Sequence, residues 1–440
     1  MSLLRRFTFG DPESRFLFER RPVFDRALAD TVARIIDDVA TEGEAAVLRH
    51  TRQFDSPLIE KLWHDVPDGV PEGLAPEDQS ALELAARRIQ DFHEVQLSTH
   101  TDGWEELPKG WGWRMDAIED GEDTGFEGQR MLPLASAGVY VPGGKASYPS
   151  SVLMNAIPAL VAGVGRVAVC TPPRPDGSLN PALLYACYLA GVDRVALAGG
   201  ASAIALMALG CEGFDRVDKV VGPGNTYVNE AKRQLWGSVG VDSYAGPSEV
   251  AVFADGSCAA QASALDLLTQ VEHAEDNIGL LVCQGERVAA AIEEACEALL
   301  RGSERESVMR AALATHGACI VVDSPDQAIT VLNQFAPEHC SLHCVNAGWV
   351  AQQVVNCGCV LIGPDSPQSV GDYVSGPSHT LPTSGAARFA SPVSVLDFLK
   401  VQSVSSLTRS DLVALSPAVE RFGSMEGLPM HGLGGSARLD

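Results

Sequence analysis

Apolar residues between positions 139 and 235 alternate between two patterns. Short β-branched runs predict buried strands at 139–142, 166–171, 194–198 and 219–222. The segments between and after them carry apolar residues at helical spacing, at 151–163, 181–191, 203–209 and 225–235. Repeated strand–helix–strand units of this kind predict a parallel sheet with helices on both faces.

A second series of the same kind begins after residue 249. Strands are predicted at 250–253, 278–282, 320–322, 340–345 and 359–362. The chain is therefore expected to hold two α/β units, although no internal repeat of fixed period is apparent in the sequence.

The remaining segments have other patterns. Helical spacing predicts helices at 30–53 and 78–96. The stretch 104–128 is rich in Trp, Gly and acidic residues and predicts an exposed hairpin or loop. From Ser394 onward the pattern is mostly helical and ends in the Gly-rich run 432–435.

Composition narrows the classes of function. The chain has 440 residues, 46% hydrophobic and 20% charged, as in an ordinary globular protein. Its formal net charge of −25 repels phosphate backbones and anionic lipid, so we expect neither a nucleic-acid nor a membrane partner. No apolar run is long enough to span a bilayer and no signal-peptide core is present, which predicts a cytoplasmic protein.

The chain has 11 cysteines, without a CxxC pair or a secreted-framework spacing. Most fall inside apolar runs and are interpreted as small buried hydrophobes. Cys340 directly follows Glu338 and His339 and is a candidate nucleophile. A strand residue is the favoured interpretation for Cys340 and Cys344, because nothing indicates a lowered thiol pKa at either.

Metal chemistry is the strongest functional signal. Gln270 and His273 lie three positions apart at the end of the apolar segment 260–272, so on a helix they share one face. That face lies at a helix C-terminus, where the dipole favours a cation. Further nitrogen and oxygen side chains lie at ends of predicted elements: Glu338, His339, Asp372, His379 and His431. Together they predict a divalent-metal site with an acid/base pair beside it.

Two glycine-rich turns offer a weaker signal. Residues 222–225 leave a predicted strand and open a helix, which suits a phosphate or a polar cofactor edge, although an ordinary turn is at least as well supported. The turn 142–145 ends in Lys145 without the Ser or Thr of a P-loop, so nucleoside triphosphate chemistry is not predicted.

Several motifs occur in the order of one known family: Tyr140–Met154, Val221–Val228, Ala245–Glu249, Gln270–His273, Ala336–His339, Val370–Tyr373, His379–Thr383, and Glu426–Leu428 with His431. As a set they resemble the histidinol dehydrogenase family, and the match covers roughly residue 30 to the C-terminus. The resemblance implies oxidation of L-histidinol to L-histidine through the aldehyde, with two NAD molecules and one zinc ion.

The resemblance also implies roles for single residues. The zinc ligands match Gln270, His273 and Asp372 of one subunit and His431 of its dimer partner, a nitrogen and oxygen set that leaves room for substrate. His339 would take the alcohol proton, and Glu338 would activate the water for the second oxidation. Further substrate contacts match Ser150, Ser151, Ser248, His379 and Glu426, with Glu426 also donated by the partner.

NAD contacts match Tyr140, Asn225 and Ser202. The family commonly has Gln at the position of Ser202, so we expect this shorter side chain to reach the cofactor only through water. Cys340 also departs from the family's usual Leu, and the stretch 104–128 has no counterpart in the pattern.

The predicted fold class is α/β, with two Rossmann-like domains and helical N-terminal and C-terminal extensions that form an intertwined homodimer. The predicted divisions are an extension 1–25, a first domain 26–140 with 246–392 that carries the metal, a cofactor-side domain 141–245, and a tail 393–440 that reaches the partner.

Two other functions stay open at this point. A zinc- and NAD-linked enzyme of the same family could act on another small polar alcohol, such as a sulfopropanediol. A non-catalytic metal-binding protein is less well supported, since it predicts loss of Glu338, His339 or a ligand, and all are present.

Overall fold

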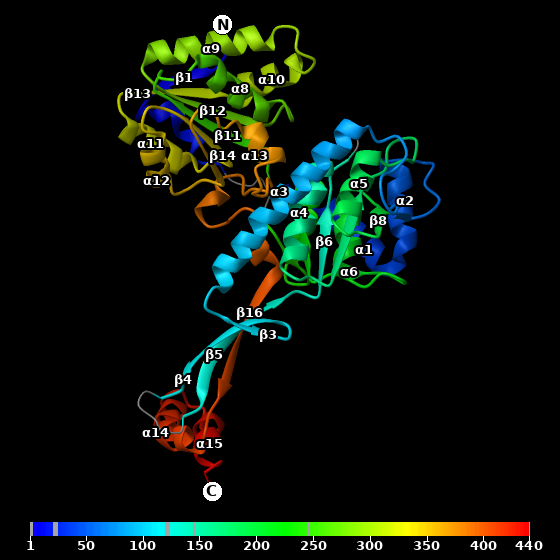
Figure 1. Cartoon of the computed structure of the whole chain (residues 1–440), viewed down its shortest axis with the longest axis vertical. Helices are drawn as coiled ribbons and strands as arrows, with labels where there is room; N and C mark the ends of the chain where they lie inside the picture. The colour runs from blue at the N-terminus through cyan, green and yellow to red at the C-terminus, as the bar shows by residue number, and fades with distance from the viewer. Residues whose placement is uncertain (1–2, 21–24, 119–123, 144–146, 244–245, 440) are drawn as a thin grey trace. The chain divides into compact units, whose positions relative to one another are not determined.

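The computed structural model describes residues 3–20, 25–118, 124–143, 147–243 and 246–439, and the chain divides into two compact units (Figure 1). The first unit comprises Met1–Val95 and Ala135–Asp397, and the second Gln96–Leu134 and Phe398–Asp440. Lys145 and Ala245, which belong to two of the sequence motifs, lie outside the described residues.

The first sheet of the first unit is fully parallel, as the near-continuous apolar runs predict. Its order is β15 (Cys359–Ile362), β14 (His339–His343), β11 (Glu249–Ala254), β12 (Ile278–Gln284), β13 (Ala318–Val322) and β1 (Arg5–Thr8). Strand β1 corrects the expectation of a helical N-terminal extension. Phe7 of this strand packs in the core of the sheet, which a period-2 pattern of only four residues does not signal.

Helices cover both faces of this sheet. One face packs against α8 (Ala260–Val271), α9 (Glu286–Leu300) and α10 (Glu306–His316). The other packs against α11 (Pro325–Phe335) and α12 (Ala347–Gln353). A short helix, α13 (Gln368–Tyr373), follows β15 and contacts α8.

The second sheet has the order β10 (Gly240–Val241), β9 (Lys219–Val221), β6 (Ser136–Tyr140), β7 (Arg166–Thr171), β8 (Arg194–Leu197) and β2 (Trp63–Asp65). Only β2 is antiparallel to its neighbour. Helices α4 (Pro149–Val161) and α5 (Pro181–Leu189) pack together, and α4 contacts β6 and β7. Core residues of α6 (Gly200–Leu209) and α7 (Thr226–Leu235) join those of β6 to β9.

Helices α1 (Arg26–Glu42) and α2 (Glu44–Phe54) pack on α6 and α7, in the core of the second sheet. Residues 26–140 had been assigned to the first α/β domain, and this segment instead supplies α1, α2, β2 and β6 to the second sheet. The domain boundaries themselves stay a prediction.

The two sheets share one strand order. Numbering each series from its first strand, both read 5-4-1-2-3, with β6 and β11 as strand 1. In both sheets the order reverses between strands 1 and 4, which is the place where open α/β sheets bind ligands. The two α/β units are therefore alike in structure, although their sequences show no repeat.

The second unit is built around an antiparallel sheet, β16 (Leu399–Ser406), β5 (Phe126–Pro133), β4 (Gly110–Asp116) and β3 (Glu105–Leu107). The expected hairpin at 104–128 is confirmed in β3 and β4. The tail contributes strand β16, which is mostly exposed, to this sheet and continues with α14 (Arg409–Met425) and α15 (Pro429–Ser436). These helices approach closely: a Cβ atom at Gly423 would lie 2.6 Å from the Cα of Gly432.

The α/β class and the parallel sheets are confirmed. Helix α3 (Pro76–Thr101) is the longest of the described helices, but it is amphipathic and polar. Within the described ranges, the helices are too short or too polar to cross a bilayer.

Candidate active site

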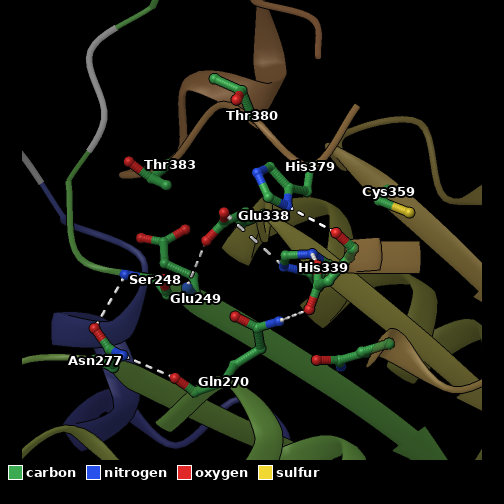
Figure 2. Close-up of polar contacts among 12 residues, drawn as sticks. Ser248, Glu249, Gln270, Asn277, Glu338, His339, Cys359, His379, Thr380 and Thr383 are labelled. Atoms are coloured by element: carbon green, nitrogen blue, oxygen red, sulfur yellow. Dashed lines mark hydrogen bonds and ion pairs between the residues drawn. The ribbon is translucent and has the colours of Figure 1, made fainter. Parts of the chain in front are cut away.

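The predicted side chains of the first unit gather where the strands of its first sheet begin. Glu338 and His339 lie at the start of β14, and Gln270 lies in the last turn of α8, which returns to this edge. Asp372 lies at the end of α13. Figure 2 shows Gln270, Glu338, His339 and His379 around one centre.

Asp372 connects three of these elements. Its Oδ2 accepts from Nε2 of Gln270 at 3.1 Å, and its Oδ1 pairs with Nε2 of His339 at 3.1 Å. Its backbone carbonyl oxygen accepts from Nδ1 of His379 at 2.8 Å. Burial works to raise the pKa of Asp372, but the bond from His339 and the charges of His339, His379 and His273 together outweigh burial and lower the pKa below its usual range.

Hydrogen bonds from α4 of the second sheet reach the same centre. The Ser151 hydroxyl and Nε2 of His379 lie 3.2 Å apart. One turn later, Nδ2 of Asn155 donates to the Thr380 hydroxyl at 3.0 Å, and both side chains are buried. These bonds join the carboxyl edge of the second sheet to the segment that presents His379.

Glu338 is a buried carboxylate with a single described hydrogen-bond donor. Its Oε2 accepts from the backbone N–H of Glu249 at 2.9 Å, and its Oε1 lies 4.0 Å from Nδ1 of His339 (Figure 2). Burial raises the pKa of Glu338 to about 7, and the charge of His339 only partly opposes this. A carboxylate with this pKa can accept a proton near neutral pH.

The pKa of His339 is raised as well, but by its neighbours and against the effect of burial. Burial works to lower its pKa, but the bond to Asp372 and the charge of Glu338 outweigh burial and raise the pKa to about 9. In this arrangement the imidazole is protonated at neutral pH. The sequence had led us to expect an ordinary pKa near 6.5.

A buried ion pair holds Glu249, the residue whose backbone N–H donates to Glu338. Arg20 pairs with Glu249, whose side chain is 1% exposed, and Glu249 Oε1 also accepts from the backbone N–H of Ser384 at 3.0 Å. The Arg20 guanidinium lies 3.7 Å from the ring centroid of Phe335 and donates to the Phe335 carbonyl. One side chain thus connects the start of β11 with the end of α11, just before Glu338.

The chain reaches Glu338 through a strained residue. Ala336 ends α11 in the left-handed region, with φ of 49°, and its N–H bonds to Leu332 O at 2.8 Å. Pro337 follows at once and removes a further donor. Such strain persists only where the surroundings enforce it, here through Arg20 and Arg388, which donate to the last carbonyls of α11.

Sequence reasoning missed a second connection between α8 and β14. His343 lies 3.2 Å from Asp266 through Nε2 and 2.8 Å from the Ser263 hydroxyl through Nδ1, and all three side chains are buried. Asp266 precedes Gln270 by one turn, and His343 lies four residues after His339. The alternation His339, Ser341, His343 on one strand face was the available signal.

A metal site is only partly assembled by the described side chains. Gln270 and Asp372 are in contact, and Oε1 of Gln270 is left free to coordinate because its Nε2 donates to Asp372. His273 follows α8 by two residues. Among the described residues, no group of three or more His, Cys, Asp and Glu side chains is arranged around one ion. Gln270 is not of these types, and His431 belongs to the second unit.

The remaining substrate residues lie in several places. Ser150 lies in the first turn of α4 beside Ser151. Ser248 precedes β11, and its backbone N–H donates to Asn277 Oδ1 at 3.1 Å. Glu426 and His431 lie in the second unit, at the end of α14 and within α15, and both are exposed.

Tyr140 and Asn225 are predicted to contact the cofactor. Tyr140 is the last residue of strand 1 of the second sheet and Asn225 follows strand 4, so both lie at its switch point. Tyr140 is buried, and its hydroxyl accepts from the N–H of Gly200 at 3.2 Å. Asn225 caps α7, with Oδ1 accepting from Tyr227 N at 3.0 Å, so Nδ2 remains for a ligand. Ser202 is 4% exposed and donates to Gly199 O at 2.9 Å.

Comparison with known proteins identifies the family. The sequence profile of histidinol dehydrogenase matches residues 19–439. The chain is 40% identical to histidinol dehydrogenase of Ruegeria pomeroyi, over 97% of this chain and 99% of the relative. It belongs to the histidinol dehydrogenase family. A second relative of that name, from Cereibacter sphaeroides, is 43% identical over 93% of this chain and 91% of its own.

A solved structure agrees with this membership. The crystal structure of histidinol dehydrogenase from Elizabethkingia anophelis superposes with a TM-score of 0.89, covers 100% of this chain and 98% of its own, and is 31% identical. The family resemblance predicted from the motifs is confirmed, and the chain is an oxidoreductase. An alternative substrate such as a sulfopropanediol is not favoured by these relatives.

Arg20→Met tests the ion pair behind Glu338. Leaving Glu249 buried without its partner is expected to lower the free energy of unfolding by about 3–5 kcal/mol, measured by chemical denaturation. Arg49→Met is the control, because Arg49 is 45% exposed in its pairs with Asp38 and Glu42 and should cost at most about 1 kcal/mol. Equal losses in the two variants would contradict this account of Arg20.

Proposed function

We propose that this chain is a histidinol dehydrogenase, which oxidises L-histidinol through L-histidinal to L-histidine with two NAD molecules and one zinc ion. Full-length similarity to relatives of that name carries the proposal. The convergence of Gln270, His339 and His379 on Asp372 supports it, because this centre combines metal-type donors with a proton-handling pair.

Gln270, His273 and Asp372 are the residues of this unit that would hold zinc, with His431 of a second copy as the fourth protein ligand. The donor set fits: Asp372 has a lowered pKa and is therefore ionised, and Oε1 of Gln270 is free. When bound, zinc would supply positive charge that holds the alcohol and offsets the charge of Asp372, which would make it easier for His339 to lose its proton.

In the first oxidation, His339 would accept the alcohol proton, and NAD would be the hydride acceptor. His379 is held by Asp372 O and by Ser151, so the position of its ring beside Asp372 is fixed. Ser150 and Ser248 add hydroxyl groups for the polar end of the substrate. These residues bind and orient, and His339 moves the proton.

In the second oxidation, a water must add to the aldehyde before the second hydride leaves. Glu338 accepts a proton from this water, for which its raised pKa of about 7 is suited. Its carboxylate is held in place by the N–H of Glu249, so little reorganisation is needed when the proton arrives.

The proposed assembly is a homodimer in which the tail of each chain reaches the other's site. The helices of the tail expose large apolar side chains, which are typical of an interface: Val413, Phe422, Met425, Met430 and Leu433 are each at least 51% exposed. His431 and Glu426 lie among them and are exposed. A cationic amino-alcohol suits the carboxylate of Glu426.

The reaction is tested by counting NADH formed from limiting L-histidinol. About two equivalents are expected, because the alcohol is carried to the acid without release of the aldehyde. Absorbance at the end of the reaction gives the yield. One equivalent would indicate a simple alcohol dehydrogenase, and none would rule out histidinol as the substrate.

Glu338→Gln tests the second base. Oxidation of L-histidinal should fall by about 10²–10⁴-fold. In the unchanged enzyme the rate of this step should fall as pH drops below about 7, because protonated Glu338 cannot act as a base, and the variant should lose this limb of the profile. Glu275→Gln, an exposed carboxylate, serves as control. If the rate of Glu338→Gln still fell below about pH 7, the titrating group would be a residue other than Glu338.

Subunit mixing tests the donated tail. Glu338→Gln and His431→Ala are each expected to be nearly inactive, but mixed dimers hold one intact site. Random exchange should restore about a quarter of the activity, since half of the dimers are mixed and each has one working site of two. No recovery, with exchange verified by mass, would mean that His431 serves its own chain.

A further inference from the structure

Asp55 lies at the carboxyl edge of the second sheet although it belongs to the end of α2. Thr51, one turn earlier, donates its hydroxyl to Leu197 O at the end of β8 at 3.0 Å. Ser56 donates to Pro175 O, in the loop after β7, at 2.9 Å. Thr51 and Ser56 are fully buried, so these bonds fix Asp55 beside the ends of β7 and β8.

The carboxylate of Asp55 rests against Gly199, which follows β8. A Cβ atom at Gly199 would lie 2.9 Å and 3.1 Å from the two Asp55 oxygens, and 3.0 Å from Cβ of Pro172. The backbone at Gly199, with φ of −112°, is one that any residue adopts. Glycine is therefore required at position 199 to leave room for the Asp55 carboxylate, and not to allow an unusual backbone conformation.

The Asp55 carboxylate has no hydrogen-bond donor in the part of the chain that the structure describes, and burial raises its pKa to about 6. The carboxylate does not cap α6 at Gly200, because the N–H of Gly200, the first of that helix, donates to the Tyr140 hydroxyl instead. A half-buried acceptor without a donor is costly, and a ligand that brings donors would remove this cost.

The topology indicates which part of a dinucleotide reaches this place. In sheets of this strand order the pyrophosphate lies at the switch point, here between β6 and β9, and the adenosine ribose lies toward the second strand, here β7. An acidic residue at the end of that strand usually binds the ribose hydroxyls. In this chain β7 ends at Thr171 and is followed by Pro172, so no acid stands there.

We propose that Asp55 supplies this missing acid: its carboxylate accepts hydrogen bonds from the ribose hydroxyls of the cofactor and selects NAD over its 2′-phosphorylated form. The inference rests on the proposed NAD dependence. Ser202, where the family commonly has Gln, is turned back to Gly199 O, so the first turn of α6 offers no competing side-chain contact. A 2′-phosphate would meet the negative charge of Asp55 and be repelled.

The test measures binding of NADH and NADPH to the full-length enzyme by fluorescence titration, without turnover. Asp55→Asn should raise the Kd for NADH about tenfold, since hydrogen bonds to a charged acceptor are the stronger ones. The preference for NADH over NADPH should narrow, because repulsion of the 2′-phosphate is lost. Asp176→Asn is the matched control: this carboxylate lies in the loop after β7 but already accepts from Ser178.

Gly199→Ala provides an independent variant, because it displaces the carboxylate while Asp55 keeps its charge. It should weaken NADH binding in the same direction, and it decides the question if Asp55→Asn fails to fold. The melting temperature of Asp55→Asn should not fall, whereas a purely structural role for the carboxylate predicts a loss.

Unchanged NADH affinity and selectivity in Asp55→Asn, beside intact oxidation of histidinol by the parent enzyme, would overturn the role of Asp55 alone. Failure of the parent enzyme to bind NADH would overturn both this inference and the proposed NAD dependence.

Discussion

The site depends on one residue, Asp372, because a single carboxyl group and its own backbone carbonyl hold three elements together. Gln270 of α8, His339 of β14 and the segment that carries His379 all bond to it. Burial opposes the charge of Asp372, and the partner that offsets this cost is His339, the proposed proton acceptor. The metal-type donors and the acid/base residue therefore share one carboxylate. A change at Asp372 is expected to affect both the metal site and the pKa of His339.

Two sheets of one strand order supply this centre from opposite edges. The first offers the amino ends of β11 and β14, and the second offers its carboxyl edge through α4 and Ser151. At the carboxyl edge of the first sheet, Asp255 follows β11, and its carboxylate accepts from Val345 N at 2.8 Å and from Ser257 N at 2.8 Å. A carboxylate placed there repels an anion.

Most of the fold was predictable because parallel strands are buried on both faces and appear as uninterrupted apolar runs; β7 was predicted with its observed limits. Strands β1 and β16 were missed, since a four-residue edge strand and a mostly exposed one lack that signal. In the site, motif residues such as Gln270 and Asp372 were named, but Arg20, Glu249 and Asp55 were not. Their importance comes from burial and from contacts between distant segments, which no local spacing encodes.

The two neighbouring carboxylates Glu249 and Glu338 illustrate how such contacts set chemistry. Burial raises the pKa of both, but only Glu249 has a guanidinium, that of Arg20, and a further N–H donor from Ser384. Glu338 has one backbone donor and an imidazole at 4.0 Å, and the charge of Glu249 raises its pKa further. One arginine thus gives two acids of like burial different surroundings: Glu249 is held in a buried ion pair, while Glu338 has no such partner and is suited to exchange a proton near neutral pH.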